Sequence, residues 1–170
     1  MQTKEINQLT EIKDFLVKFA LNPSGMVLLA GMNGTGKSYA ARAVYSDFNP
    51  PMSTMEFDDK IFTSQASLNI KWQEVINKYG TTLYLLKNLC YPKLLILDDI
   101  GTRAPSEAFL DFLYAIIDYR YENRESRGTI ITTNLTSDTM RVKFGDAFVS
   151  RVGGGKIFRF EGEDRRSIQF

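Results

Sequence analysis

The segment GMNGTGKS, residues 31–38, constrains this chain more than any other part of its sequence. It fits the pattern G-x-x-x-x-G-K-[ST], whose glycines let backbone N–H groups curl around a phosphate. An apolar run at 26–30 precedes the segment and an alanine-rich stretch at 37–48 follows it. A plain glycine-rich turn with a surface lysine is the alternative reading. The strand, loop and helix in succession favour a phosphate-binding loop at the positive end of a helix dipole.

This loop predicts a set of ligand contacts. Lys37 is placed to reach the β- and γ-phosphates of a nucleotide, and the Ser38 hydroxyl is placed to bind Mg²⁺. The predicted nucleotide-binding residues of the loop are Gly31, Asn33, Gly34, Thr35, Gly36, Lys37, Ser38 and Tyr39.

A second motif, LLILDDIG at 94–101, places two acids after an apolar run. In α/β folds the carboxyl ends of buried strands carry ligand chemistry, and a carboxylate there can hold Mg²⁺. Asp98 is therefore a predicted metal ligand, and Asp99 is the candidate to orient or deprotonate an attacking water. The alternative is a strand that simply ends in a solvated acidic turn.

Two further side chains complete the candidate site. Asn134 closes the β-branched run GTIITTN, where it can position a water or serve only as a turn former. Arg151, in AFVSRVGGG, has the planar charged fork that suits a transferring phosphoryl group, and the adjacent glycines would let a loop present it. An ordinary surface arginine is the alternative. The pair Arg165 and Arg166 is first explained by surface pairing with neighbouring acids.

Composition excludes several classes of site. The chain has 170 residues, which suit one domain, and no histidine, which removes His-ligated zinc and the Ser-His-Asp triad. The lone Cys90 favours a reducing compartment and a role as a small apolar core residue. The net charge of +1 gives no overall attraction to nucleic acid or membrane. No segment is long and apolar enough to span a bilayer or act as a signal peptide, so we expect a cytoplasmic protein without a membrane partner.

Apolar spacing predicts that strands and helices alternate along the chain. The expected helices lie at 4–20, 37–48, 67–79, 81–89 and 105–124, with a shorter helical stretch after residue 134. The expected strands lie at 26–30, 93–99, 128–134 and 156–160, with an uncertain one within 52–66. This alternation predicts an α/β fold with a parallel sheet covered on both faces.

Together these motifs resemble the AAA+ ATPases, in particular the DnaC-type helicase loaders and the IstB-type transposition helper ATPases. GMNGTGKSYAARAV resembles their Walker A loop and helix, and LLILDDIG their Walker B strand. GTIITTN resembles their sensor 1 strand, and FGDAFVSRVGGG the segment that carries their arginine finger. The resemblance spans residues 25 to 166, and its five ordered motifs are more specific than the Walker A loop alone.

The resemblance implies a P-loop NTPase sandwich with a five-stranded parallel sheet, in which the sensor strand lies between the Walker A and Walker B strands. It implies one ATPase core over 1–170, with a helix and turn at 1–24, the nucleotide-binding fold at 25–166 and no full C-terminal lid. The cofactors would be ATP and Mg²⁺. Arg151 would act on a neighbouring subunit's nucleotide in a ring or spiral, and Arg166 stands nearest to the family's sensor 2 residue.

The same resemblance implies ATP hydrolysis coupled to DNA replication or transposition. The expected partners are a replicative helicase or a related protein and single-stranded DNA. The insertion at 67–89 would carry DNA contacts, for which Lys71, Trp72, Lys78 and Lys87 are candidates. An origin in a phage or mobile element stays open.

Three departures from the family pattern keep other functions open. About 25 residues precede the Walker A strand, the second Walker B acid is Asp99 where many relatives have Glu, and the chain ends early for a helical lid. A regulatory module that binds ATP, hardly hydrolyses it, and caps a helicase or loader is the first alternative. A small P-loop kinase is the second, but residues 40–90 supply no basic, glycine-hinged lid for one.

Overall fold

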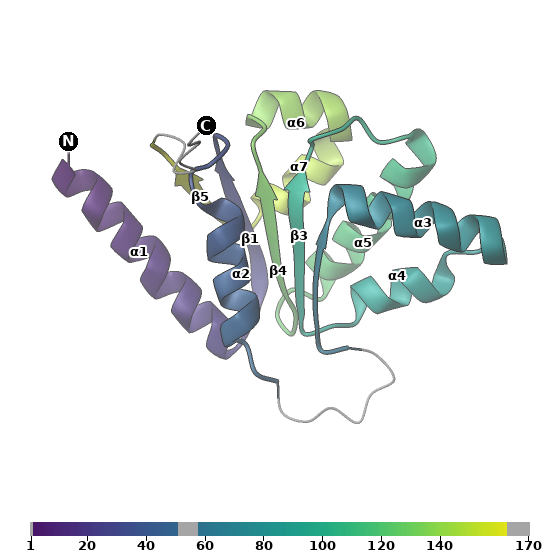
Figure 1. The fold of residues 1–170 in the computed structure, drawn as a ribbon, viewed down its shortest axis with the longest axis horizontal. Helices are drawn as coiled ribbons and strands as arrows, with labels where there is room; N and C mark the ends of the chain where they lie inside the picture. Colours follow the sequence, from purple (N-terminus) through teal and green to yellow (C-terminus); the bar gives the residue numbers. More distant parts are fainter. Residues whose placement is uncertain (1, 51–57, 163–170) are drawn as a thin grey trace, which may run out of the picture.

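The computed structural model describes residues 2–50 and 58–162, with side chains from residue 10 onward (Figure 1). Its strands are β1 Gly25–Gly31, β2 Lys60–Ser64, β3 Leu94–Ile100, β4 Gly128–Thr133 and β5 Lys156–Phe160. Its helices are α1 Gln2–Leu21, α2 Lys37–Asp47, α3 Gln65–Tyr79, α4 Leu83–Cys90, α5 Glu107–Glu122, α6 Ser137–Phe144 and α7 Asp146–Gly153. The predicted alternation of strands and helices is confirmed.

The strands form one sheet in the order β2-β3-β4-β1-β5, and every neighbouring pair is parallel. The β4 strand therefore lies between β1 and β3, as the resemblance implied. Ile131 of β4 is in register with Leu28 of β1 and with Leu97 of β3. The carboxyl ends of these three strands consequently share one edge of the sheet, where the phosphate-binding loop, the two acids Asp98 and Asp99, and Asn134 lie.

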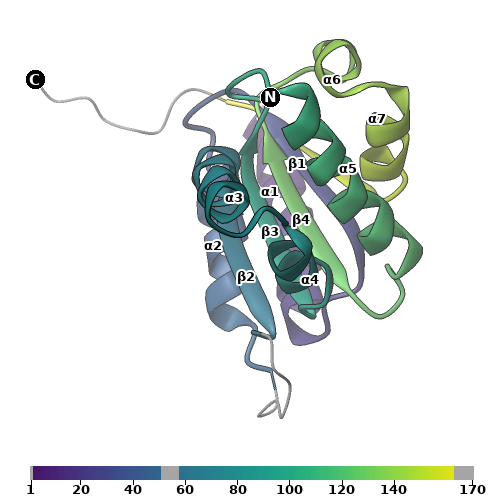
Figure 2. The same ribbon diagram turned by 90° about the vertical axis from the view of Figure 1, so that its right-hand side faces the viewer.

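Helices cover both faces of this sheet because every strand alternates apolar side chains between its two sides. On one face, Val27 and Leu29 of β1 pack with Ala41 and Val44 of α2 and with the buried residues of α1. On the other face, Leu28 packs in a larger core with the helices α4 to α7. Figure 2 shows α2 on one side of the sheet and α5 with α7 on the other.

The α5 helix begins with a side-chain cap and continues as a buried stripe. Ser106 accepts a hydrogen bond from the Phe109 backbone N–H, so the helix begins at Glu107 and not at Pro105. Its apolar residues at helical spacing are all buried, as predicted: Phe109, Phe112, Leu113, Ile116 and Ile117. Arg120 continues the same stripe and is fully buried as well.

The short helical stretch predicted after β4 is two helices. Gly145 separates α6 from α7 with a backbone φ of 83°, a conformation that favours glycine. Phe144 and Phe148, one from each helix, stack at 4.9 Å between ring centroids in the core. The α7 helix is thereby fixed against the sheet close to β5.

The insertion between β2 and β3 forms the helices α3 and α4, which lie at one side of the molecule in Figure 1. Trp72 of α3 packs against Phe109 of α5 at 5.6 Å between ring centroids. Its ring is therefore partly buried in the packing between helices. No helix within residues 2–50 and 58–162 is long and apolar enough to cross a membrane.

Candidate functional site

The loop between β1 and α2 has the backbone that its glycines predicted. Gly34 and Gly36 have φ values of 74° and 101°, which other residues rarely adopt. Lys37 is 5% exposed, and its Nζ donates to the Met32 carbonyl at 2.6 Å. The Thr35 hydroxyl donates to the same carbonyl at 2.8 Å. The loop thus folds back on itself, with its lysine directed inward at the N-terminus of α2.

The Asp98 carboxylate ends the buried strand β3 and is 4% exposed. Its Oδ1 accepts a hydrogen bond from the Thr132 hydroxyl of β4 at 2.6 Å. The Thr132 oxygen in turn accepts from the Asp99 backbone N–H at 2.9 Å. A single threonine therefore holds both acids of the motif, and it ties the end of β3 to β4.

Asp99 lies in a local irregularity at the end of β3. The pairing of β3 with β4 shifts register between Leu97 and Ile100, and Asp99 has a φ of 55°. Among the described residues it is the only non-glycine with positive φ. Such strain of a non-glycine residue is typical of functional sites. The shift turns Asp98 inward and leaves Asp99 exposed beside it.

Asn134 joins the sensor strand to the phosphate-binding loop. It follows β4 directly and is exposed, and its side-chain amide donates to Asn33 Oδ1 at 3.2 Å. The two residues are 101 positions apart in the sequence. The structure therefore brings together the loop, Asn134 and, through the neighbouring strand, Asp98 and Asp99.

The segment that follows Asp99 is held by a residue that the sequence reasoning missed. Gln65, the first residue of α3, is 3% exposed. Its Oε1 accepts from the Gly101 N–H at 2.6 Å, and its Nε2 donates to the Arg103 carbonyl at 3.0 Å. No spacing pattern marks this glutamine. Thr132 was also missed, although buried threonines in an apolar strand do signal polar partners.

Arg151 lies on the helix α7 and not on a glycine-presented loop, which corrects the sequence-based expectation. Gly155, in the glycine run after it, serves close packing, since a Cβ there would lie 1.9 Å from the Met26 carbonyl oxygen. The Arg151 Nε–H donates to Asp118 of α5, and this hydrogen bond raises the pKa of the guanidinium. The described contacts of Arg151 are to α5 and α7, and none is to the loop of its own subunit.

The remaining predicted residues are the two C-terminal arginines, Tyr39 and Gly31. Arg166, and Arg165 beside it, lie outside the described residues. Tyr39 is on the first turn of α2 and is 80% exposed. Gly31 pairs with Phe160 of β5, so it fixes where β1 ends.

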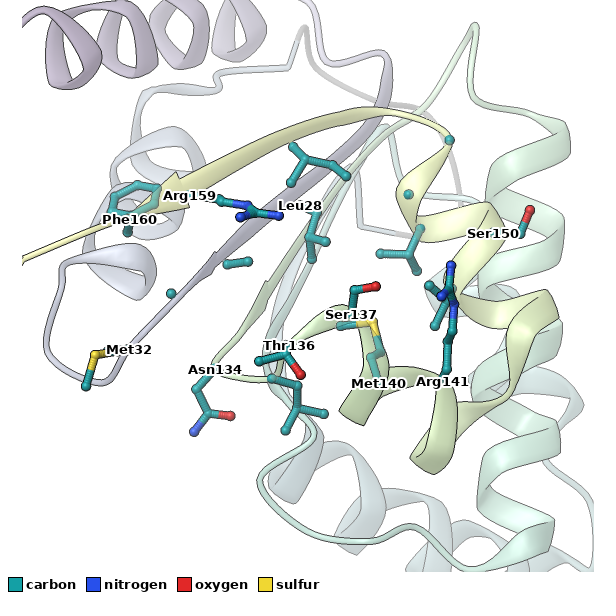
Figure 3. A pocket seen from close by; sticks show the side chains of 18 of the residues that line it. Leu28, Met32, Asn134, Thr136, Ser137, Met140, Arg141, Ser150, Arg159 and Phe160 are labelled. Carbon is teal, nitrogen blue, oxygen red and sulfur yellow. The ribbon is translucent and has the colours of Figure 1, made fainter. Parts of the chain in front are cut away.

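A pocket of about 870 Å³ opens beside the phosphate-binding loop, on the face of the sheet that carries α6 and α7. Met32 and Asn134 line its one end, and Arg159 of β5 and Arg141 of α6 lie on opposite sides of it (Figure 3). Its apolar floor includes Leu28. Lys37, Ser38 and Asp98 do not line it, so the pocket shares Gly31 and Asn134 with the candidate site but does not include its lysine or its predicted metal ligands.

Comparisons with known proteins concern the fold and the family. The fold matches DnaA of Aquifex aeolicus bound to AMPPCP with a TM-score of 0.73 and 20% identity, over 92% of this chain and 47% of that one. It matches the DnaC helicase loader with a TM-score of 0.69 and 23% identity, over 90% of this chain and 88% of that one. At these identities the likeness concerns the fold.

Sequence comparison adds a match to one protein over a short region and a match to a family over most of the chain. The proteasome-associated ATPase of Mycobacteroides abscessus is 33% identical over 82 residues, which cover 46% of this chain and 14% of that protein. The chain thus spans about half of the Aquifex DnaA and a seventh of the proteasome-associated ATPase. The family described as IstB-like ATP binding protein matches residues 3–152, which include the loop, both acids, Asn134 and Arg151. The chain belongs to this family of ATP-binding proteins, and its fold is similar to those of DnaC and DnaA.

Proposed function

We propose that the protein hydrolyses ATP in a Mg²⁺-dependent reaction at sites shared between neighbouring copies, and that it acts with DNA replication or transposition machinery. The observation that carries this proposal is the convergence at one edge of the sheet. Asn134 bonds to Asn33 of the loop, and Thr132 holds Asp98 and Asp99 on the neighbouring strand. A glycine-rich turn with only a structural role does not require the loop, Asn134 and the two acids to lie together.

Lys37 and the loop amides are proposed to bind the β- and γ-phosphates. The inward lysine donates to Met32 O, an oxygen that stands where a phosphate oxygen can replace it as acceptor. The helix N-terminus behind the loop adds to the attraction. Gly31, Gly34, Gly36 and Thr35 shape the loop around the phosphates, and Tyr39 lies exposed on the next turn.

Ser38 and Asp98 fit the needs of Mg²⁺. Nucleotide-bound Mg²⁺ takes only one or two protein ligands, because phosphates and waters supply the others. The described residues contain no cluster of three or more acidic or thiol ligands, and this mode requires none. When bound, the ion would neutralise charge on the phosphates during transfer. Thr132 fixes the carboxylate orientation beforehand.

Asp99 and Asn134 are proposed to place the attacking water. The water oxygen bonds to the γ-phosphorus, the bond from that phosphorus to the bridging oxygen breaks, and ADP and phosphate leave. Asp99 accepts the water proton, and Asn134 donates a hydrogen bond that orients the transferring group or the water. Catalysis of this kind depends mainly on positioning and on fixed charge.

Arg151 is proposed to complete the site of a neighbouring copy. It is carried on the sheet face opposite to α2, and its described contacts do not include its own phosphate-binding loop. An arginine supplied to a transferring phosphoryl group is worth about 10³ to 10⁵ in rate. Hydrolysis therefore requires assembly, in the ring or spiral that the family resemblance implies.

ATP turnover per subunit, followed over a wide range of protein concentration, tests this proposal. We expect turnover to rise with concentration, and to fall on the order of 10³-fold in Arg151→Ala. The matched control is Arg124→Ala. Arg124 also stacks on a tyrosine, Tyr121, with its Cζ 4.3 Å from the ring centroid, but at the opposite end of the sheet. Turnover near zero at every concentration, with ATP still bound, would instead identify a regulatory module that acts by binding.

Single-stranded DNA is the proposed ligand of the α3–α4 surface. Tyr79 and Tyr84 are 63% and 61% exposed there, and the Lys78 Nζ lies 5.0 Å from the Tyr79 ring centroid. Exposed rings beside lysines suit stacked bases and a phosphate backbone. Lys71 and Lys87 are exposed on the same two helices. The expected protein partner is a helicase or recombinase of the cytoplasm.

Binding of a fluorescent oligothymidine to the ATP-loaded protein tests the DNA proposal. We expect Tyr79→Ala to weaken binding by a factor on the order of 10, because one stacking contact contributes about 1 to 3 kcal/mol. Lys18→Ala, an exposed lysine on α1, is the matched control for Lys78→Ala. Equal binding by Tyr79→Ala, Lys78→Ala and the wild type would exclude this surface.

A further inference from the structure

Arg151 is held by two residues of α5 that no motif singled out. Its Nε–H donates to Asp118, and its Cζ lies 5.1 Å from the centroid of the Tyr114 ring. Tyr114 and Asp118 are four positions apart on α5, so they occupy the same face of that helix. The guanidinium therefore meets an acceptor at one edge and an aromatic ring at its face.

The Arg151–Asp118 pair is less exposed to solvent than a neighbouring ion pair between α6 and α7. The side chains of Arg151 and Asp118 are 28% and 40% exposed. Arg141 instead bonds to Asp146 at 3.5 Å, with exposed fractions of 56% and 93%. The Arg141–Asp146 pair is typical of exposed surface bridges, whereas the Arg151–Asp118 pair is less exposed and is joined by the Tyr114 ring.

The hydrogen bond from Nε to Asp118 leaves the opposite edge of the Arg151 guanidinium, with Nη1 and Nη2, directed away from that carboxylate. The Nε edge is used by the carboxylate, and Nη1 lies 3.4 Å from the Ala147 carbonyl, a long contact. No hydrogen bond of Nη2 is described within the structure. A guanidinium binds phosphoryl oxygens in a bidentate manner through the two Nη groups, so this edge retains the geometry that phosphate recognition needs.

The helices that carry these residues are themselves fixed. Phe148 and Val152 of α7 lie in the same core as Leu113 and Ile117 of α5. The distance between the backbone of Arg151 and that of Asp118 is thus set by core packing. A long arginine side chain otherwise samples many rotamers, and misplacing a catalytic group by about 1 Å can cost on the order of 10² in rate.

We propose that Asp118, supported by Tyr114, is a positioning residue that holds Arg151 ready to bind the nucleotide of the neighbouring copy. Asp118 does not touch the nucleotide, and it acts through the orientation of the Nη edge. This inference rests on the proposed shared site. Asp118 of α5 would thus promote hydrolysis of the ATP bound to the neighbouring subunit, and not of the ATP bound to its own subunit.

Asp118→Ala and Asp118→Asn separate orientation from simple packing. In the assembled protein, we expect Asp118→Ala to lower kcat by a factor of about 10 to 10², with the KM for ATP unchanged. Asp118→Asn keeps an oxygen acceptor for Nε–H, so its kcat should stay within about threefold of the wild type. Tyr114→Phe keeps the ring and should behave in the same way. The Tm of all three should change little, because partly exposed ion pairs contribute little to stability.

Mixing two inactive variants tests which subunit needs Asp118. Lys37→Ala lacks the phosphate-binding lysine but carries Arg151, and Arg151→Ala has the opposite defect. Their mixture should recover turnover when a Lys37→Ala copy lends its arginine to an Arg151→Ala site. The double variant Lys37→Ala/Asp118→Ala should restore about 10 to 10² times less turnover. Adding Asp118→Ala to the Arg151→Ala partner should make no difference.

The outcomes distinguish this inference from the proposed function. Equal recovery with and without Asp118 in the lending subunit would overturn the inference while the shared site stands. Turnover raised by Asp118→Ala would also overturn it, because Asp118 would then restrain Arg151 and not position it. No recovery in the first mixture, or normal turnover in Arg151→Ala alone, would overturn the shared site and the inference with it.

Discussion

The two ends of the sheet use buried polar residues in opposite ways. At the amino ends of the strands, Arg120 is fully buried and donates to carbonyls of Leu89, Cys90, Pro92 and Gly128 at 2.5 to 3.3 Å. Its Nε also donates to the Thr129 hydroxyl at 2.6 Å. These acceptors belong to the end of α4, the turn into β3 and the start of β4. One side chain therefore joins three segments of the fold.

At the carboxyl ends, the buried lysine makes a local contact. Lys37 donates to a carbonyl five residues earlier in the same loop, and Asn134 bonds to an exposed neighbour. Asp99 adopts a strained conformation there, whereas the positive φ values of the described residues are otherwise found at glycines. We therefore expect loss of the Arg120 charge to destabilise the fold, and we propose that the Lys37 charge serves a ligand.

The largest effect should follow from removing the charge at the amino ends. Arg120→Met leaves four carbonyls and a hydroxyl without their donor, and we expect the free energy of unfolding to fall by about 3 to 5 kcal/mol. Burial lowers the pKa of Arg120 to about 9, so the group is charged at neutral pH and its loss removes charged hydrogen bonds. Chemical denaturation at pH 7 measures the change.

Arg124→Ala is the matched control, because Arg124 lies in the same region but is not fully buried. Its change should be within about 0.5 kcal/mol. An Arg120→Met variant as stable as Arg124→Ala would remove the distinction between the two ends.

The next effect should appear at the carboxyl ends, in the response to nucleotide. With ATP at 100 times its Kd, binding should stabilise the wild type by about 2.7 kcal/mol, and Lys37→Met should lose this gain. Its unfolding without ATP should match that of the wild type, because Thr35 still donates to Met32 O. Thermal unfolding with and without ATP measures both quantities.

The control is Lys93→Met, since Lys93 also donates to a backbone carbonyl, that of Ser126 at 2.9 Å, but at the amino ends. It should respond to ATP as the wild type does. A loss of the ATP response in Lys93→Met, or its survival in Lys37→Met, would contradict the assignment of the two ends.

A third effect, of about 2 kcal/mol, concerns the pH dependence of the amino ends. Burial raises the pKa of Cys90 from 9.0 to about 11, although Arg120 and Arg127 act against it. The unfolded chain loses the thiol proton above pH 9 while the folded chain retains it. This contribution to stability is therefore complete below pH 9 and is lost as the pH rises to about 11.

Unfolding of the wild type and of Cys90→Ala at pH 8 and pH 11 measures this contribution. The wild type should lose about 2 kcal/mol more than the variant between the two values, because only the wild type carries the thiol. Parallel losses would mean that the amino ends admit solvent to Cys90.

The sequence predicted the carboxyl ends far better than the amino ends. The loop, Asp98 and Asn134 each stand in a short motif, and these motifs predicted that the three lie at one edge of the sheet. Arg120 has no motif, yet it continues the helical spacing of Ile116 and Ile117, and that continuation was the available signal. An arginine within such a stripe is usually solvated, and the acceptors that bury this one come from distant segments.

The order of the strands was predictable through the family resemblance, whereas tertiary contacts between helices were not. Asp118 meets Arg151 only because α5 and α7 pack in one core. Gln65 reaches Gly101 across 36 residues, with no pattern in either segment. Such contacts depend on distances between packed elements, which residue spacing along the chain does not contain.

The smallest effect compares the two ends within a single strand. β4 carries Thr129, which accepts from Arg120 at its amino end, and Thr132, which donates to Asp98 at its carboxyl end. Both are fully buried. Thr→Val at either position replaces the hydroxyl by a methyl group and keeps the shape of the side chain. Each substitution should therefore lower the free energy of unfolding by about 1 to 2 kcal/mol.

The two valine variants should differ only in how strongly ATP with Mg²⁺ stabilises them. Thr132→Val releases Asp98 from its fixed orientation, so the Mg²⁺-dependent part of the stabilisation by ATP should shrink by about 1 kcal/mol, as expected for one lost hydrogen bond. Thr129→Val should keep the whole of it, and Thr132→Ser, which retains the hydroxyl, should keep most. Thermal unfolding with ATP, with and without Mg²⁺, measures the difference. Equal responses of Thr129→Val and Thr132→Val to ATP and Mg²⁺ would mean that Thr132, like Thr129, has only a structural role. The orientation of Asp98 would then not depend on β4.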